Sequence, residues 1–218
     1  MRRYRFLLLL AVLSIPAIAC GLATQLTDRL SQPGEAVFRD DYSHPYTGWL
    51  RGTDLPNGGI ADYENGKFRI LVNESNFDYW SNPNLAFKDA RIEVDAVKQA
   101  GPEVNRFGLI CRYKDEKNFY VFIVSSDGYF GVGKVRDDHL SLIGMNEMLP
   151  SNAILAGSGL NHLRADCVGD QLTFYVNGRQ VAQVNDSDFS SGDVGILAGT
   201  FDQPGVDVTF DNFVVVKP

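Results

Sequence analysis

The sequence has few of the residues from which metal and nucleophilic sites are built. Its 218 residues include only 3 cysteines and 3 histidines. His44, His139 and His162 are scattered, and no Cys-x-x-Cys or His-x-x-x-His spacing occurs, so there is no zinc motif. A Gly-x-Ser-x-Gly nucleophile turn and a glycine-rich phosphate loop are also absent. These absences argue against zinc enzymes, α/β-hydrolases and nucleotide-binding enzymes.

The sequence also has no apolar run long enough to cross a membrane as a helix. The run at residues 6–15 is apolar apart from Ser14, and it is shorter than the roughly 20 residues that a bilayer requires. Three arginines precede this run, and Pro16 and Ala17-Ile18-Ala19 lead from it to Cys20. The order of basic, apolar and small residues predicts an export signal over residues 1–19.

The stretch Ala17-Ile18-Ala19-Cys20 resembles the lipobox of bacterial lipoproteins. The resemblance implies cleavage before Cys20, lipid on its thiol, and anchoring to the outside of a bacterial cell membrane or to the outer membrane. The alternative is an ordinary export signal that is cut just before an incidental cysteine. Residues 21–36 show no strand alternation and contain Pro33-Gly34, so we expect residues 20–36 to form a lipidated tether.

Basic residues are scarce once the export signal is removed. Residues 1–19 contain three of the 20 basic residues and none of the 27 acidic ones, which leaves 17 basic against 27 acidic residues and a net charge of −10. Such an acidic domain is a poor partner for nucleic acid or for anionic phospholipid. The membrane is therefore expected as a partner only through the lipid on Cys20.

Two cysteines remain after Cys20, namely Cys111 and Cys167. An exported protein sits where disulfides persist, and two thiols allow a single pairing. We therefore predict a disulfide between Cys111 and Cys167. The alternative is two separate buried thiols, because free cysteine also prefers the core.

From residue 37 onward the sequence consists of short β-type runs between turn residues. Asp127-Gly128, Gly169-Asp170 and Asn177-Gly178 are typical of tight hairpin turns. The clearest runs are residues 68–72, 90–98, 107–113, 119–125, 129–135, 161–168, 172–177, 194–198 and 208–216. Many short strands and no convincing long helix predict one all-β domain over residues 37–218, a two-sheet antiparallel sandwich or jelly roll.

Six short motifs stand out along residues 36–218. They are Phe38-Arg-Asp-Asp-Tyr42 with Gly48-Trp49, Phe107-Gly-Leu-Ile-Cys-Arg112, Asn118-Phe-Tyr-Val-Phe122, Leu172-Thr-Phe-Tyr-Val-Asn-Gly178, Ser191-Gly-Asp-Val-Gly195 and Phe210-Asp-Asn-Phe213. These motifs resemble the concanavalin A-like lectin and glucanase superfamily, and within it the laminin-G-like and 3-keto-disaccharide hydrolase modules of bacterial envelope proteins. The resemblance implies a jelly roll whose first strand, near residues 37–42, lies beside the last. It also implies binding of glycans or other proteins, which is common among members, and some members hydrolyse glycosides.

Glu93 and Asp95 are the sharpest catalytic candidates. They share one face of a predicted strand, and paired carboxylates are what a glycosidase uses. The laminarinase-type glucanases of this superfamily carry a second glutamate where this sequence has Val97 or Lys98. We therefore favour a solvated strand face with alternating charge and assign no catalytic residue.

Aromatic residues in two predicted loops form the candidate ligand site. The segment at residues 73–83 contains Phe77, Tyr79 and Trp80, and Trp49 lies in an earlier loop. Sugar sites combine an aromatic platform with a few fixed polar groups, so Trp80, Tyr79 and Trp49 are the candidate ligand contacts. The alternative for each tryptophan is a core plug beneath a loop.

No organic cofactor is expected, and calcium is the one metal considered. The family resemblance implies a structural calcium where the first and last strands meet, which would use Asp40, Asp41 and Asp211. We favour the alternative, in which these aspartates hydrogen-bond to turns.

Together these features predict a surface-tethered, non-catalytic binding module for carbohydrate, for another envelope component or for a surface protein. The alternatives are a glycan-processing hydrolase of the 3-keto-disaccharide type and a structural subunit of an envelope assembly. Whether the protein is an enzyme stays open, with the missing glutamate weighing against it.

Overall fold

The computed structural model describes residues 34–218, so the expected export signal, Cys20 and most of the expected tether lie outside the described residues. Within residues 34–218, no helix has the length and apolar character needed to cross a membrane. The elements are β1 (Ala36–Asp40), β2 (Gly52–Leu55), η1 (Pro56–Gly58), β3 (Gly59–Glu64), β4 (Lys67–Val72), β5 (Asp78–Ser81), β6 (Ala90–Ala100), β7 (Asn105–Asp115), β8 (Asn118–Val124), β9 (Tyr129–Arg136), β10 (His139–Leu142), β11 (Leu149–Pro150), β12 (Asn161–Val168), β13 (Gln171–Val176), β14 (Arg179–Asn185), β15 (Asp193–Thr200) and β16 (Val206–Val216).

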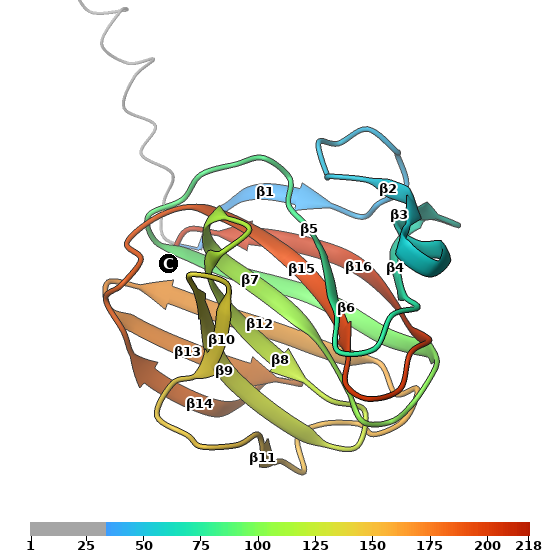
Figure 1. Cartoon of the computed structure of the whole chain (residues 1–218). Coiled ribbons are helices and arrows are strands. Elements are labelled where there is room, and N and C mark those ends of the chain that lie inside the picture. The colour runs from blue at the N-terminus through green and yellow to red at the C-terminus, as the bar shows by residue number, and fades with distance from the viewer. Residues whose placement is uncertain (1–33) are drawn as a thin grey trace, which may run out of the picture. The chain divides into compact units, whose positions relative to one another are not determined.

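These strands form two antiparallel sheets, which confirms the predicted all-β sandwich (Figure 1). Sheet A has the order β14-β13-β12-β6-β16-β4-β3-β2, with β1 also paired to β16. Sheet B has the order β10-β9-β8-β7-β15-β5, with β11 paired to β9. In Figure 1 the strands of sheet B lie in front of those of sheet A.

The first and last strands of the domain are neighbours, as the family resemblance implies. Phe38 pairs with Val215 and Asp40 with Phe213, while the first half of β16 pairs with β4 along the same edge. A bulge in β16 near Asn212, whose φ is 54°, separates the two paired regions.

Hairpins close at the predicted turns. Gly128, Gly169, Asn177 and Gly178 all have positive φ, between 51° and 97°. Glycine and asparagine adopt this left-handed region more readily than other residues do. Asn177-Gly178 thus joins β13 directly to β14, with both turn residues in the conformation that a two-residue hairpin turn requires.

The core lies between the sheets and follows strand alternation. In β12 the buried residues alternate with partly exposed ones, so Leu163, Ala165 and Cys167 face the core while His162 and Arg164 face outward. The same alternation in β6 buries Ile92, Val94 and Ala96. The core cluster also contains large rings from both sheets, namely Phe68, Phe174, Phe210 and Phe213 of sheet A and Phe107 and Phe122 of sheet B.

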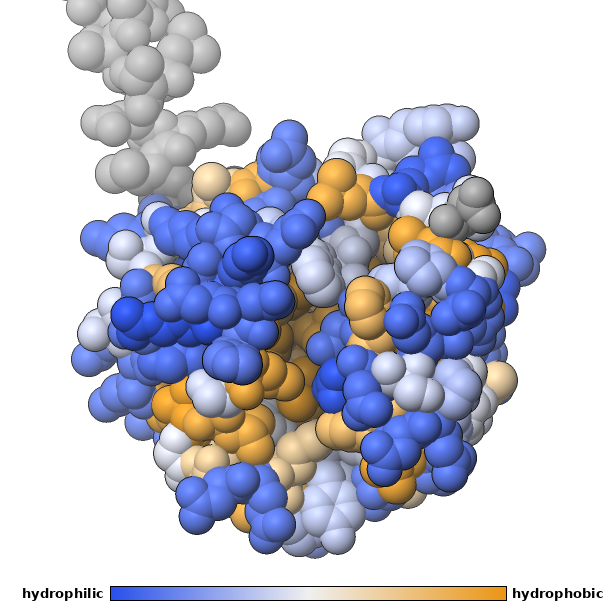
Figure 2. Space-filling model, in the orientation of Figure 1, coloured by the Kyte–Doolittle hydropathy of each residue, from blue (hydrophilic) through white to orange (hydrophobic). Residues whose placement is uncertain are grey.

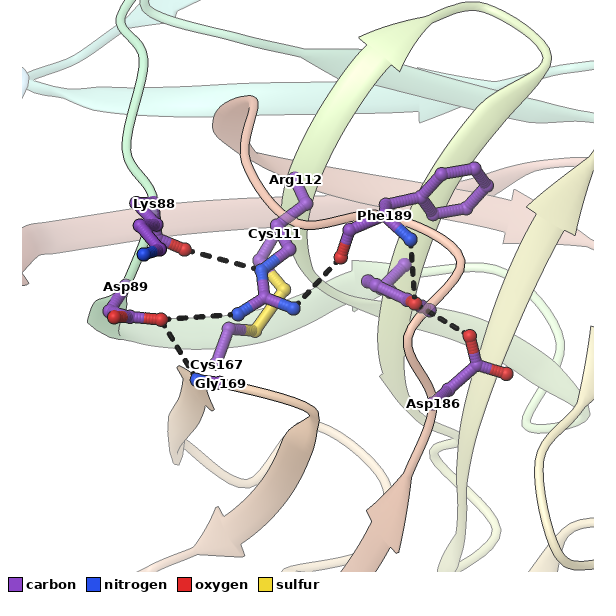
Figure 3. Close-up of a disulfide and its surroundings, with 9 residues drawn as sticks. Lys88, Asp89, Cys111, Arg112, Cys167, Gly169, Asp186 and Phe189 are labelled. Carbon is purple, nitrogen blue, oxygen red and sulfur yellow. Dashed lines mark hydrogen bonds and ion pairs between the residues drawn. A yellow bond between two sulfur atoms is a disulfide. The ribbon is translucent and has the colours of Figure 1, made fainter.

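The predicted disulfide is confirmed and joins the two sheets (Figure 3). Cys111 of β7 and Cys167 of β12 are bonded, with their α-carbons 6.9 Å apart. Beside it, the buried Arg112 donates from Nη1 to the carbonyl oxygen of Phe189 at 2.8 Å and from Nη2 to Asp89 at 3.3 Å. Arg112 has a φ of 54° at a bulge in β7, so a covalent bond and a buried guanidinium fix the same point of the sandwich.

Candidate functional site

The outward face of sheet B carries a second, smaller hydrophobic cluster. Its buried members are Ile110, Phe119, Val121, Ile123 and Leu197. Because strand residues alternate between faces, these side chains point away from the main core. Figure 2 shows this face hollowed along its centre, with hydrophobic residues in orange on the floor and hydrophilic residues in blue on either side. The sheet therefore presents an apolar floor outward, which is uncommon for an exposed sheet face.

The larger hollow, which we call the cleft, has a volume of about 690 Å³. It lies where β7 and β8 meet the segment that follows β9 and the loop after β15. Its apolar lining includes Val104, Ile123, Leu140, Leu142, Met145 and Met148, its aromatic lining consists of Tyr129 and Phe201, and its charged lining consists of Arg106 and Asp127. A mostly apolar hollow with a few placed polar groups is the usual form of a ligand pocket.

A second hollow of about 300 Å³, the Trp80 pocket, lies at the β5 edge of the same sheet. Trp80 packs against Phe119 with ring centroids 5.6 Å apart, and its indole N–H donates to the Tyr113 hydroxyl at 3.4 Å. Phe77, which is 38 % exposed, and Glu116 also line the pocket. The pocket thus offers aromatic surface beside polar groups.

An ion pair connects the two hollows. Nε of Arg106, which lines the cleft, donates to Oδ1 of Asp78, which lines the Trp80 pocket, at 2.5 Å. The guanidinium carbon of Arg106 lies 4.7 Å from the centroid of the Phe201 ring. Burial raises the pKa of Asp78, and the neighbouring charge of Arg106 opposes that rise. Arg106 thereby keeps the Asp78 carboxylate charged at neutral pH more readily than burial alone would allow.

The structure separates the three predicted aromatic contacts. Trp49 is 4 % exposed in the main core, and its indole N–H donates to Asp40 at 2.8 Å. Tyr79 is 7 % exposed, and its hydroxyl donates to the carbonyl oxygen of Pro56 at 3.2 Å. Of the three, Trp80 lies on the outward face of β5 and in the second cluster, while Tyr79 borders the Trp80 pocket from the core side. Trp49 therefore has the core-plug position, and Trp80 and Tyr79 are the candidates that border a hollow.

Glu93 and Asp95 lie on the outward face of sheet A. His162 Nδ1 is 2.8 Å from Asp95, and its Nε2 is 3.4 Å from Glu93. The Asn212 side-chain amide donates to the other oxygen of Asp95 at 2.9 Å. Neither carboxylate lines the cleft or the Trp80 pocket. The arrangement is the alternating-charge strand face that the sequence favours.

The three aspartates considered for calcium are engaged in other contacts. Asp40 accepts hydrogen bonds from the Tyr42 backbone N–H and from Trp49, and Asp41 accepts from Ser43. Asp211 forms an ion pair with Lys67. Among residues 34–218, no three His, Cys, Asp or Glu side chains are grouped so as to hold a metal ion. Asp40 and Asp41 thus hydrogen-bond within the turn that follows β1, and a structural calcium at these aspartates stays a prediction.

Sequence reasoning missed Arg106, Asp78 and Phe201. One signal was present, because Arg106 and Gly108 alternate with Phe107 and Leu109, which places Arg106 on the outward face of β7. Nothing in the sequence shows that Asp78, 28 residues earlier in the chain, lies opposite it.

No protein-family model matches the sequence, and no curated protein matches it. Solved structures do resemble it. The carbohydrate-binding module CBM66 from Bacillus subtilis is 23% identical, covers 78% of this chain and 95% of its own, and has a TM-score of 0.59. The GH43 protein BlXynB from Bacillus licheniformis is 14% identical, with 83% of this chain and 39% of its own covered and a TM-score of 0.61.

A laminarinase from Flavobacterium sp. UMI-01 is also similar, at 14% identity, with 84% of this chain and 100% of its own covered and a TM-score of 0.56. At such low identity these likenesses concern the fold and not the chemistry. Residues 34–218 therefore have the concanavalin A-like β-sandwich fold that the sequence motifs resemble.

Proposed function

We propose that this domain is a non-catalytic carbohydrate-binding module. The observation that carries the proposal is the outward face of sheet B, where Trp80 and Phe201 lie on either side of the Arg106–Asp78 pair. Aromatic and apolar surface suits the CH faces of a sugar ring, while hydroxyl groups need fixed donors and acceptors. Among the solved structures, one of the same fold is itself named as a carbohydrate-binding module, which supports the proposal.

We also propose that the module is exported and tethered through lipid on Cys20, with residues 20–36 as the spacer. The sequence order of basic, apolar and small residues before Cys20 supports this. A confirmed disulfide between Cys111 and Cys167 fits an oxidising compartment outside the cytoplasm. The module would then display its glycan-binding face at the cell surface, where another surface protein stays an alternative ligand.

The direct test is to apply purified residues 20–218 to a glycan array. Each glycan that binds is then incubated with the protein and assayed for released sugars. Binding without hydrolysis is the expected result. Hydrolysis that Glu93→Gln abolishes would replace the binding module with the glycan-processing hydrolase. Absence of binding to every glycan would overturn the proposed function.

A further inference from the structure

Arg106 offers hydrogen-bond donors that the protein itself does not use. The Arg106 side chain is only 11% exposed, yet Nε is the only one of its nitrogens that has a hydrogen-bond partner within the described residues 34–218. The two terminal nitrogens of Arg106 have no hydrogen-bond partner among these residues, and they are not among the atoms that are buried and unpaired. They are therefore accessible to solvent, in the cleft that Arg106 lines. A guanidinium fixed in this way presents N–H groups at a set position.

Asp78 supplies the matching acceptor. A carboxylate has about four lone-pair positions, and the described part of the chain uses Asp78 Oδ1 alone, through Arg106. The Asp78 side chain is 27% exposed and lines the Trp80 pocket. A donor and an acceptor thus stand side by side, which matches adjacent sugar hydroxyls because each hydroxyl both donates and accepts.

The backbone of β15 holds this pair in place. A Cβ atom at Gly199 would collide with the Asp78 carboxylate and lie 2.9 Å from Nε of Arg106. The Arg106–Asp78 pair therefore packs directly against the backbone of β15 at Gly199, in space that the side chain of any other residue would occupy. Phe201 covers the guanidinium from one side. Such support preorganises a binding group before the ligand arrives.

Charge on this face argues against an acidic ligand. Arg106 is already neutralised by Asp78, and Asp127 and Glu116 add negative charge to the cleft and the Trp80 pocket. The other cation that lines either hollow, Arg51, is paired with Asp62. A carboxylate on the ligand would find no uncompensated cation here and would face two anions.

The distance between the hollows indicates a chain of sugars. Ile123 of the cleft lies on β8 and Trp80 on β5, with β7 and β15 between them. Neighbouring strands are about 4.8 Å apart, so the two residues stand roughly 14 Å apart across the sheet. A single monosaccharide does not span that distance.

We infer that the ligand of this face is a neutral oligosaccharide, bound through a pair of neighbouring hydroxyls by Arg106 and Asp78, and that uronate-containing glycans are excluded. The inference rests on the proposed function and narrows it to a substrate class. It predicts that binding depends on the geometry of the pair and depends only weakly on salt, because no net charge is neutralised.

The experiment uses residues 20–218 and two sets of glycans. Dextran, mannan and laminarin represent neutral chains, and polygalacturonate and alginate represent uronates, each titrated at 50 mM and 500 mM NaCl. Arg106→Ala and Asp78→Asn should weaken the neutral interaction by about 10- to 100-fold. Arg106→Lys, which keeps the charge but loses the planar fork, should also bind more weakly. Gly199→Ala tests the geometry without changing any charge.

The matched control is Arg179→Ala. Arg179 lies on β14 of the other sheet and contacts Asn152, so its removal changes the charge equally and should leave binding unchanged. All variants are compared by thermal unfolding, and the conservative Arg106→Lys and Asp78→Asn carry the test if Gly199→Ala does not fold.

The outcomes separate the inference from the proposed function. Neutral binding that is lost with Arg106 or Asp78, kept with Arg179→Ala and insensitive to salt supports the inference. Equal or tighter binding of polygalacturonate or alginate, or full binding by Arg106→Ala, overturns the inference and leaves the binding module standing. No binding to any glycan, on this panel or the array, overturns both.

Discussion

Trp80 differs from its neighbour Tyr79 in the face of β5 on which it lies. The Trp80 ring belongs to the outward cluster, whereas the Tyr79 ring packs in the main core and only borders the same hollow. Trp80→Ala should weaken glycan binding by about 1 to 3 kcal/mol if the ring touches sugar, because aromatic contact of this kind is worth that much. The measurement is calorimetric titration of a glycan identified on the array.

Trp49→Ala serves as the contrasting variant. Trp49 packs edge-on against Phe213 at 4.8 Å and donates to Asp40, so its removal leaves a core cavity. We expect Trp49→Ala to lower the free energy of unfolding by about 3 to 5 kcal/mol, without a direct effect on sugar contacts. A Trp80→Ala variant that binds glycan as well as the parent would show that the platform lies elsewhere.

At the scale of single residues, sequence alone could identify aromatic side chains but not their faces in β5. Residues 73–83 look like a polar loop because Asn, Ser, Asp and Pro surround the rings. Four residues of this segment form a short strand, Asp78–Ser81, which pairs with β15. Alternation then buries Tyr79 and exposes Trp80. Long-range pairing decides this outcome, and local sequence does not contain it.

At the scale of elements, the Cys111–Cys167 bond holds β7 of one sheet to β12 of the other across 56 residues of chain. Removing it with the double change Cys111→Ala and Cys167→Ala should lower the free energy of unfolding by about 2 to 4 kcal/mol, chiefly because the unfolded chain regains freedom. Denaturant unfolding of variant and parent measures the difference. Two thiols that alkylate freely in the native protein would contradict the bond.

A charged network connects β9 and β8 to the segment that follows β14. Lys134 donates to Asp186 at 2.5 Å and to Asp188 at 2.6 Å, and Tyr120 donates to Asp186 at 2.6 Å. Burial works to raise the pKa of Asp186, but hydrogen bonds from Lys134, Tyr120 and the Asp188 backbone outweigh it and lower that pKa. The hydrogen bond from Lys134 likewise lowers the pKa of Asp188.

A lowered folded-state pKa has a definite sign for stability. The folded state binds protons less readily than the unfolded chain, so the stabilisation is present above the ordinary value of 3.8 and is lost as the pH falls through the folded-state pKa. Asp186→Asn should cost about 1.5 to 3 kcal/mol at pH 7 and should flatten the fall in stability between pH 5 and pH 2. Urea unfolding of Asp186→Asn and of the parent across this pH range tests the prediction. If the slope of stability against pH were the same in both proteins, the network would not be the cause of the fall in stability.

Element prediction succeeded where strands are long and apolar. Each of the strand runs predicted from sequence matches β4, β6, β7, β8, β9, β12, β13, β15 or β16, with residues 125 and 177 lying one residue beyond β8 and β13. The missed strands are short or polar, as in β14 with the sequence RQVAQVN at an edge of sheet A. An edge strand buries little side-chain surface, so its sequence needs no apolar alternation. The buried outward face of sheet B was also missed, because Gly108, Gly131 and Gly133 interrupt the pattern there.

At the scale of the whole molecule, the proposed function needs the binding face and the anchor to belong to one protein. The fold supplies the candidate face, since the cleft and the Trp80 pocket both border the outward face of sheet B, the pocket together with β2 and β3 of sheet A. The anchor depends on Cys20 in the sequence. The two parts make separable predictions, because loss of lipid should leave glycan binding intact.

Cys20→Ala should abolish labelling with a fatty-acid analogue and release the protein from membranes or leave it unprocessed. A diacylated cysteine buries many methylenes at about 0.8 kcal/mol each, which makes the lipid a durable anchor. Cys167→Ala is the matched control, because it removes a cysteine that lies in the buried disulfide. That variant should still be labelled and fractionate with membranes, which is also the result expected of the parent. If Cys20→Ala stayed membrane-bound as tightly as the parent, the tether would have to be protein and not lipid, and Cys20 would be incidental to anchoring.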